Sequence, residues 1–245
     1  MELFEGIIHE FRAFIDGLPS RRTWEEELQS VWPGGGHRSV VMREDLGCEL
    51  GSPEMESVSC ILWTGKQNLV KNGCITLVGP DFTEAAGHGL PFGKIVLAGV
   101  DGFDEENTYD RHRDLDLLRY DLDLKGFMIR AVSQHQKEWC RISADALRSG
   151  FSAQTLASSL MALFRAKDYV QSMEVILITS SPGDVRALRE IVAPAARIIA
   201  AMDKMAIELE TDCETCDYQD VCGDAEQLKA MRKTLQGKNR EAYHA

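Results

Sequence analysis

The sequence contains no long hydrophobic run. None of its apolar stretches approaches the roughly 20 residues that a helix needs to cross a bilayer. The opening segment, MELFEGIIHEFRAFIDGL, has neither a basic region nor a small-residue cleavage site, and its apolar residues fall on one face of a helix. These absences exclude a helical membrane span and a secretory signal, and they predict a cytoplasmic protein.

Positive charge is scarce. The chain has 27 lysines and arginines against 39 aspartates and glutamates, which gives a net charge of −12. Broad, non-specific binding of nucleic acid needs a basic surface, so the composition argues against that class of function. An anionic ligand is still compatible with the sequence, but only through a local cluster of arginines.

The cysteines lack the pattern of a disulfide framework. Their number is odd, at seven, and four of them are scattered along the chain: Cys48, Cys60, Cys74 and Cys140. A secreted, disulfide-bonded domain is therefore not expected. The histidines show no metal-ligand spacing among themselves, and neither a nucleophile elbow nor a Ser/His/Asp order is evident. The cysteine pattern predicts a reduced compartment with one thiolate cluster.

Four short apolar runs, bounded by Gly, Pro, Asn or Asp, predict strands. The runs are Val58–Trp63, Ile75–Gly79, Ile95–Val100 and Glu174–Ser180. Because helical patterns alternate with them, the expected fold class is α/β, with a mixed sheet flanked by helices and a C-terminal cysteine-rich metal-binding tail.

The helical patterns occupy most of the remaining chain. Two short helices are expected in the first 30 residues, and one long helix from Asn107 to about Glu138. Ser143 and Ser152 are candidate N-caps of two further helices. The last pattern runs from Pro182 to about Glu210, with a kink expected at Pro194.

These patterns predict three parts. They are an N-terminal helical segment over 1–44, an α/β domain over 45–210, and a cysteine cluster with a basic C-terminal helix over 211–245.

The strongest chemical signal is the segment DCETCDYQDVC, which places Cys213, Cys216 and Cys222 in a C-x2-C-x5-C pattern. Thiolates are soft ligands that select Zn²⁺ or iron–sulfur iron. A structural zinc site usually pairs two C-x2-C knuckles, and no second knuckle is present. The spacing around Tyr218 is similar to the three-cysteine half of [4Fe–4S] sites in certain nucleases. The prediction is a [4Fe–4S] cluster, with zinc as the alternative; unmetallated thiols or a thioredoxin-like pair are the other interpretations.

A fourth ligand must come from one of the scattered cysteines or from outside the protein. Cys60 and Cys74 lie in or beside apolar strands, where a buried structural cysteine is the usual case. Cys140 follows Trp139 at the end of the expected long helix. Cys48 lies in the polar stretch DLGCELGSP, which is expected to be a loop. Cys48 is therefore the predicted fourth ligand.

Arginines and aromatic residues gather between residues 109 and 141, around Arg130, Trp139 and Arg141. Arginine binds phosphate through two hydrogen bonds, and an indole stacks on a purine. This combination suits a nucleotide-like ligand such as coenzyme A (CoA). The alternative is a solvated helix held by pairs such as Asp110–Arg113 and Asp116–Arg119, which have i,i+3 spacing.

Four stretches carry a family resemblance: ELGSPEMESVSCILWT, ITLVGPDF, the long run from LPFGKIVLAGV through EWCRIS, and MEVILITSS. Residues 45 to 205 resemble the non-catalytic middle domain of acetyl-CoA synthase, the β subunit of the carbon monoxide dehydrogenase/acetyl-CoA synthase complex. That enzyme joins CO, a methyl group from a corrinoid iron–sulfur protein, and CoA. The resemblance implies that Trp139 and Arg141, and then Arg130, help to hold CoA.

The sequence departs from that family in its metal motif. The family's nickel–iron–sulfur cluster requires a longer cysteine series and a Cys-Gly-Cys segment, and neither occurs here. The chain is therefore expected to be a binding or accessory protein of anaerobic one-carbon metabolism that lacks the nickel domain. Its expected partners are carbon monoxide dehydrogenase or a corrinoid iron–sulfur protein, and neither nucleic acid nor a membrane. The alternatives are an iron–sulfur redox component or a zinc-clasped structural interaction module.

Overall fold

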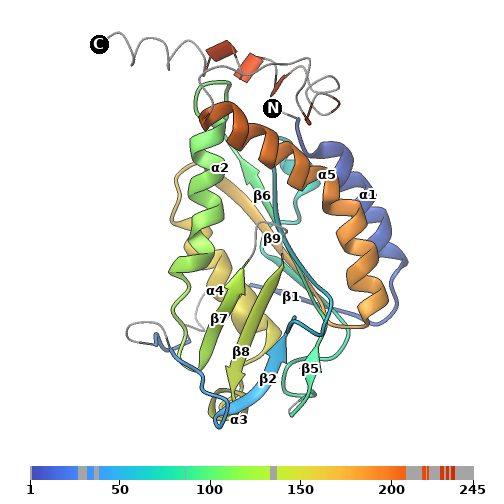
Figure 1. Cartoon of the computed structure of the whole chain (residues 1–245), viewed down its shortest axis with the longest axis vertical. Helices are drawn as coiled ribbons and strands as arrows, with labels where there is room; N and C mark the ends of the chain where they lie inside the picture. Colours follow the sequence, from blue (N-terminus) through green and yellow to red (C-terminus); the bar gives the residue numbers. More distant parts are fainter. Residues whose placement is uncertain are drawn as a thin grey trace.

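The fold was determined as a computed structural model (Figure 1). The structure describes residues 2–26, 32–35, 39–85, 87–132 and 137–207, together with 217, 218, 220, 227, 228, 230, 231, 233 and 234. The predicted α/β class with a mixed sheet flanked by helices is confirmed, although the strands form two sheets and not one. The cysteines of the predicted metal-binding tail lie outside the described residues.

The larger sheet has five strands in the order β1-β4-β9-β6-β3. These strands are β1 (Arg21–Glu25), β4 (Cys74–Val78), β9 (Val170–Ile178), β6 (Phe92–Val100) and β3 (Ser57–Thr64). β3 pairs in parallel with β6 and β4 with β9, whereas β6 and β9 are antiparallel. Both β3 and β6 are buried along their whole length, as continuous apolar runs predict for strands covered on two faces. All four strands predicted from the sequence lie in this sheet.

The smaller sheet has four strands in the order β5-β2-β8-β7. They are β5 (Gly89–Leu90), β2 (Leu46–Leu50), β8 (Glu138–Ser143) and β7 (Phe127–Val132). None of these strands was predicted. Figure 1 shows β7, β8 and β2 at the front of the molecule, with no described helix drawn over them.

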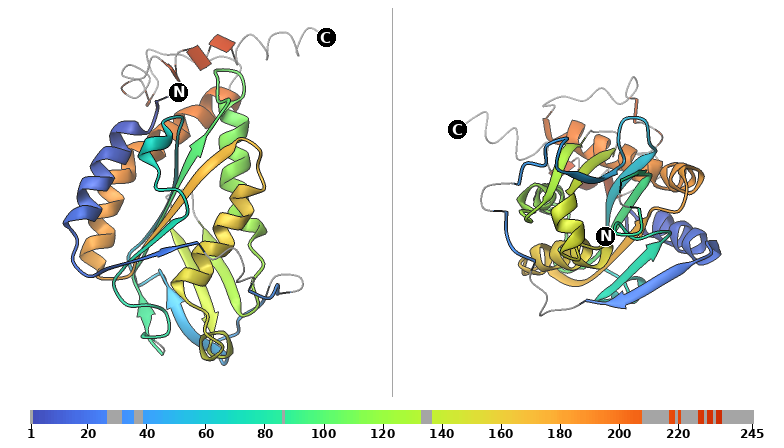
Figure 2. Two further views of the ribbon diagram at one scale, coloured as in Figure 1. Left: turned by 180° about the vertical axis from the view of Figure 1, so that it is seen from behind. Right: turned by 90° about the horizontal axis from the view of Figure 1, so that it is seen from below.

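The described helices are α1 (Glu5–Gly17), α2 (Thr108–Leu117), α3 (Ala144–Arg148), α4 (Ala153–Arg165) and α5 (Pro182–Ile207), with short 3₁₀ turns η1 (Gln67–Leu69) and η2 (Leu118–Asp121). α5 packs on β3 and β6, and α1 lies beside α5 (Figure 1). α4 packs on β9 and β4, where Figure 2 shows it from behind. None of these helices combines the length and the apolar character that a bilayer-crossing helix requires.

The predicted helix ends are largely confirmed. The Ser143 and Ser152 side chains accept hydrogen bonds from the backbone N–H groups of Ala146 and Thr155, which caps α3 and α4. α5 begins at Pro182, contains Pro194, and changes direction along its length (Figure 1). The predicted Asp116–Arg119 ion pair is also present, with a distance of 2.6 Å.

Two helix predictions are wrong. The expected long helix from Asn107 to Glu138 ends at Leu117, and the chain then forms η2, β7 and β8. Gly126 adopts φ +78°, and a side chain there would meet Ser143 Oγ at 2.5 Å, so the chain turns at this glycine. The second expected N-terminal helix is instead β1, which pairs antiparallel with β4. Segment 1–44 therefore contributes a strand to the large sheet.

Candidate functional site

The sequence EWCRIS forms β8, and its side chains alternate between the two faces of the small sheet. Glu138, Cys140 and Ile142 are buried, whereas Trp139 and Arg141 are half-buried. Successive side chains of a strand point to opposite faces, so Trp139 and Arg141 share the outer face. The sequence predicted that Cys140 lies at the end of a helix. That prediction is wrong, because Cys140 lies within strand β8.

Arg130 reaches the same face from the neighbouring strand β7. The pairing of β7 with β8 is regular up to Ile129 and resumes at Ala131, so Arg130 occupies a β-bulge. A bulge adds one unpaired residue and turns its side chain away from the regular alternation. The guanidinium carbon of Arg130 lies 5.5 Å from the centre of the Trp139 ring, and that of Arg141 lies 5.4 Å from it.

Glu49 of β2 extends this arrangement to a third strand. It is the register partner of Arg141, and its Oε1 accepts a hydrogen bond from Arg141 Nε at 2.7 Å. Glu49, Arg141, Trp139 and Arg130 thus form one continuous line of side chains across β2, β8 and β7. We call this line the outer row.

Two polar groups of the outer row, the indole N–H of Trp139 and the guanidinium of Arg130, have no polar partner among the described residues. Trp139 Nε1 is buried and has no hydrogen-bond partner in the described part of the chain, although an unmade bond of this kind costs about 1–3 kcal/mol. Arg130 is exposed and forms no ion pair with the described side chains. The row can therefore offer the face of an aromatic ring and the guanidinium of Arg130 to a ligand with a flat ring and negative charges.

The inner face of β8 carries a buried ion pair. Lys94 Nζ of β6 lies 2.6 Å from both carboxylate oxygens of Glu138, and this contact joins the two sheets. Burial opposes ionisation of Glu138, but the charge of Lys94 and hydrogen bonds from Lys94 and Ser59 outweigh it, so the pKa of Glu138 lies below its usual value. Burial also raises the pKa of the adjacent Cys140 thiol well above its usual value.

A cavity of about 480 Å³ lies between β3, α2 and α5. Cys60, His112, Arg119, Asp203 and Tyr218 are among its lining residues. Trp63 Nε1 donates to His112 Nδ1 at 3.2 Å, so the neutral imidazole carries its proton on Nε2. Burial lowers the pKa of His112 to about 4. Cys60 and Tyr218 both line this cavity, and Tyr218 stands between Cys216 and Cys222 in the sequence.

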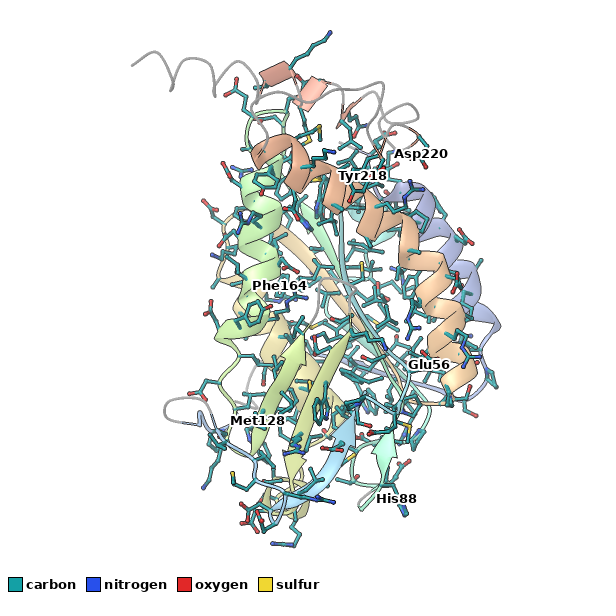
Figure 3. All side chains as sticks on the ribbon, viewed as in Figure 1. Glu56, His88, Met128, Phe164, Tyr218 and Asp220 are labelled. Carbon is teal, nitrogen blue, oxygen red and sulfur yellow. The ribbon has the colours of Figure 1, made fainter. Side chains whose placement is uncertain are left out.

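The cysteine predictions have different outcomes. Cys213, Cys216 and Cys222 lie outside the described residues. The loop predicted around Cys48 is wrong, because Cys48 is a buried residue of β2. Burial raises the pKa of its thiol to about 12, which works against the thiolate that binds a metal. β2 also lies at the opposite end of the molecule from Tyr218 (Figures 1 and 3).

No three His, Cys, Asp or Glu side chains within the described ranges are placed so that they could hold a metal ion.

The sequence analysis named Trp139, Arg141 and Arg130 as ligand candidates. It did not predict that they lie on the paired strands β7 and β8. It did not find Glu49 or the Lys94–Glu138 pair, because both contacts depend on strand pairing between distant segments. One signal was present: the second part of β8, Cys140 to Ser143, alternates apolar and polar residues with the period of a strand.

The fold and the outer row define an α/β protein with an arginine- and tryptophan-bearing sheet face. Residues 35–183 match the family described as the CO dehydrogenase/acetyl-CoA synthase complex beta subunit, which is more than half of the chain. The chain belongs to this family. The matched range includes every residue of the outer row.

A curated relative is also similar. Over 146 residues the chain is 30% identical to the acetyl-CoA decarbonylase/synthase complex subunit beta of Methanothermobacter thermautotrophicus strain Delta H. The match covers 58% of this chain and 30% of that protein. The chain thus spans less than a third of the relative's length.

Proposed function

We propose that this protein is a CoA-binding accessory protein of one-carbon metabolism based on CO, methyl groups and CoA. One observation carries the proposal: the guanidinium carbons of Arg130 and Arg141 lie 5.5 and 5.4 Å from the centre of the Trp139 ring, on the outer face of the small sheet. Membership of the family supports the choice of CoA among nucleotide-like ligands.

In the proposed complex, the adenine of CoA stacks on Trp139 and the phosphates bind Arg130 and Arg141. Stacking of a base on an aromatic side chain contributes about 1–3 kcal/mol. Guanidinium groups bind phosphate through paired, charge-assisted hydrogen bonds.

Calorimetric titration with CoA tests this proposal. Trp139→Leu should weaken CoA binding at least fivefold, which corresponds to the lower end of the stacking contribution. Trp24→Leu is a matched control, because Trp24 is also half-buried and has the guanidinium of Arg22 6.0 Å from its ring. Absence of CoA binding by the parent protein, or equal losses in both variants, would overturn the proposal.

We further propose that Cys213, Cys216 and Cys222 hold a [4Fe–4S] cluster in the C-terminal tail, with zinc as the alternative metal. Their spacing and the softness of thiolate ligands support this. Cys48 was the predicted fourth ligand, but β2 lies at the opposite end of the molecule from Tyr218, whereas Cys60, which is also buried, lines the cavity that Tyr218 lines. Cys60 is therefore the better-placed cysteine.

Iron and sulfide analysis of protein purified without oxygen tests the cluster. About four iron and four sulfide per chain, lost in Cys216→Ser, would support it. Cys60→Ser should then change the EPR spectrum of the reduced cluster, with Cys48→Ser as the matched control. One zinc without sulfide would exclude the iron–sulfur form, and unchanged metal content in Cys216→Ser would contradict metal binding by these cysteines.

The proposed partner is carbon monoxide dehydrogenase or a corrinoid iron–sulfur protein, because the family takes its name from a multi-subunit complex. Size-exclusion chromatography of purified components checks this directly. Separate elution of this chain from both proteins at micromolar concentration would argue against a stable complex.

A further inference from the structure

Glu49 places a negative charge on the arginine that the proposed CoA site uses. It lies opposite Arg141 in the pairing of β2 with β8, and its carboxylate accepts the hydrogen bond from Arg141 Nε at 2.7 Å. Both side chains are mostly shielded from solvent, with exposed fractions of 21% for Glu49 and 17% for Arg141. A carboxylate in this position makes the same kind of contact with the guanidinium that a phosphate oxygen would make.

The two arginines of the outer row therefore differ in availability. Arg141 is engaged by Glu49, whereas exposed Arg130 forms no ion pair within the described residues. A ligand with one anionic group would gain little at Arg141, because it would exchange one carboxylate for another anion. A ligand with several anionic groups can bind Arg130 first and then compete with Glu49 for Arg141.

We propose that Glu49 is an internal competitor that holds Arg141 until a phosphate of the ligand displaces it. The site then selects ligands that combine a flat aromatic ring with at least two negatively charged groups. This inference rests on the proposed function and adds a residue that controls access to the same site.

The decisive variant is Glu49→Gln, which keeps the shape of the side chain and removes its charge. Calorimetric titration should show CoA binding about fivefold tighter than in the parent, which corresponds to about 1 kcal/mol, the upper end for a solvent-screened ion pair. Thermal stability should fall slightly, because the ion pair with Arg141 is lost. A purely structural role for Glu49 predicts losses in both quantities, so the opposite signs are diagnostic.

Glu56→Gln is the matched control. Glu56 pairs with Arg186 and Arg189 of α5, not with an arginine of the outer row, and lies beside α5 in Figure 3. Glu56→Gln makes the same change in net charge as Glu49→Gln. Its affinity for CoA should equal that of the parent. Glu49→Asp provides a second variant. It keeps the negative charge but shortens the side chain by one methylene, which moves the carboxylate away from Arg141. It should tighten CoA binding less than Glu49→Gln does.

The outcomes separate this inference from the proposed function. Unchanged or weaker CoA binding by Glu49→Gln, with binding by the parent intact, overturns the competitor role and leaves the CoA site standing. Equal tightening by Glu49→Gln and Glu56→Gln also overturns it, because the effect would then come from net charge alone. Binding by Glu49→Gln but not by the parent overturns both the proposed function and the competitor role, because Glu49 would then block the site and not yield to a phosphate of the ligand. Absence of CoA binding by both overturns the CoA site and the competitor role together.

Discussion

The two faces of β8 use charge in opposite ways. On the inner face, Glu138 forms a buried ion pair with Lys94, and the charge of Lys94 favours the ionised carboxylate. On the outer face, Arg141 and Arg130 lie beside a half-buried indole, and only Arg141 has an acidic partner in the described structure. A buried pair serves the packing of the two sheets, whereas partly exposed cations remain available to a ligand. Adjacent residues of one strand thus separate a buried ion pair from the face that is proposed to bind a ligand.

The largest expected effect comes from breaking the inner pair. Lys94→Met leaves the Glu138 carboxylate buried without its cation, so the free energy of unfolding should fall by about 3–5 kcal/mol. Urea unfolding measures this change. The double variant Lys94→Met with Glu138→Leu should recover most of the loss, because a packed apolar pair replaces a buried ion pair at little cost. A single variant within 1 kcal/mol of the parent would show that the pair is not structural.

The next effect concerns the pH dependence of the buried side. Burial depresses the pKa of His112 from 6.5 in the unfolded chain to about 4 in the folded protein. Its contribution to stability is therefore complete above pH 6.5 and is lost as the pH falls towards 4. Between pH 7.5 and 5 this amounts to about 2 kcal/mol.

Urea unfolding at both pH values, with His112→Gln as the comparison, tests this expectation. Glutamine keeps an acceptor for Trp63 Nε1 and does not titrate. The variant should be less stable than the parent at pH 7.5, and the difference should shrink at pH 5. An unchanged pH dependence in the variant would assign the acid sensitivity to other groups.

The smallest stability effects are expected on the outer face. Arg130→Gln should change the free energy of unfolding by less than about 0.5 kcal/mol, since the side chain is exposed. Arg141→Gln should cost about 1 kcal/mol, because it removes the pair with Glu49. Both variants should weaken CoA binding. A loss of stability in Arg130→Gln as large as that in Lys94→Met would erase the distinction between the two faces.

The features predicted correctly from the sequence are those that depend on residues close together in the chain. The buried strands β3, β4, β6 and β9 were predicted because their apolar runs are continuous and end at turn residues. The caps at Ser143 and Ser152 were predicted as well, because each depends on a hydrogen bond between residues only three positions apart in the sequence. Strands β7 and β8 were missed because a leucine-rich helical periodicity precedes them in the sequence. The predicted helix was extended through this region to Glu138, although α2 ends at Leu117.

By itself, the sequence determined the α/β class, the helix starts, the C-x2-C-x5-C spacing and the identity of the arginine and tryptophan candidates. Only the tertiary structure decided that Glu49, 92 residues from Arg141, lies opposite it, and that Lys94 neutralises Glu138 across the two sheets. It also decided that Cys48 is buried in β2 while Cys60 lines a cavity. The physical reason is register: which residues meet across paired strands depends on how distant segments align, and no local pattern contains that information.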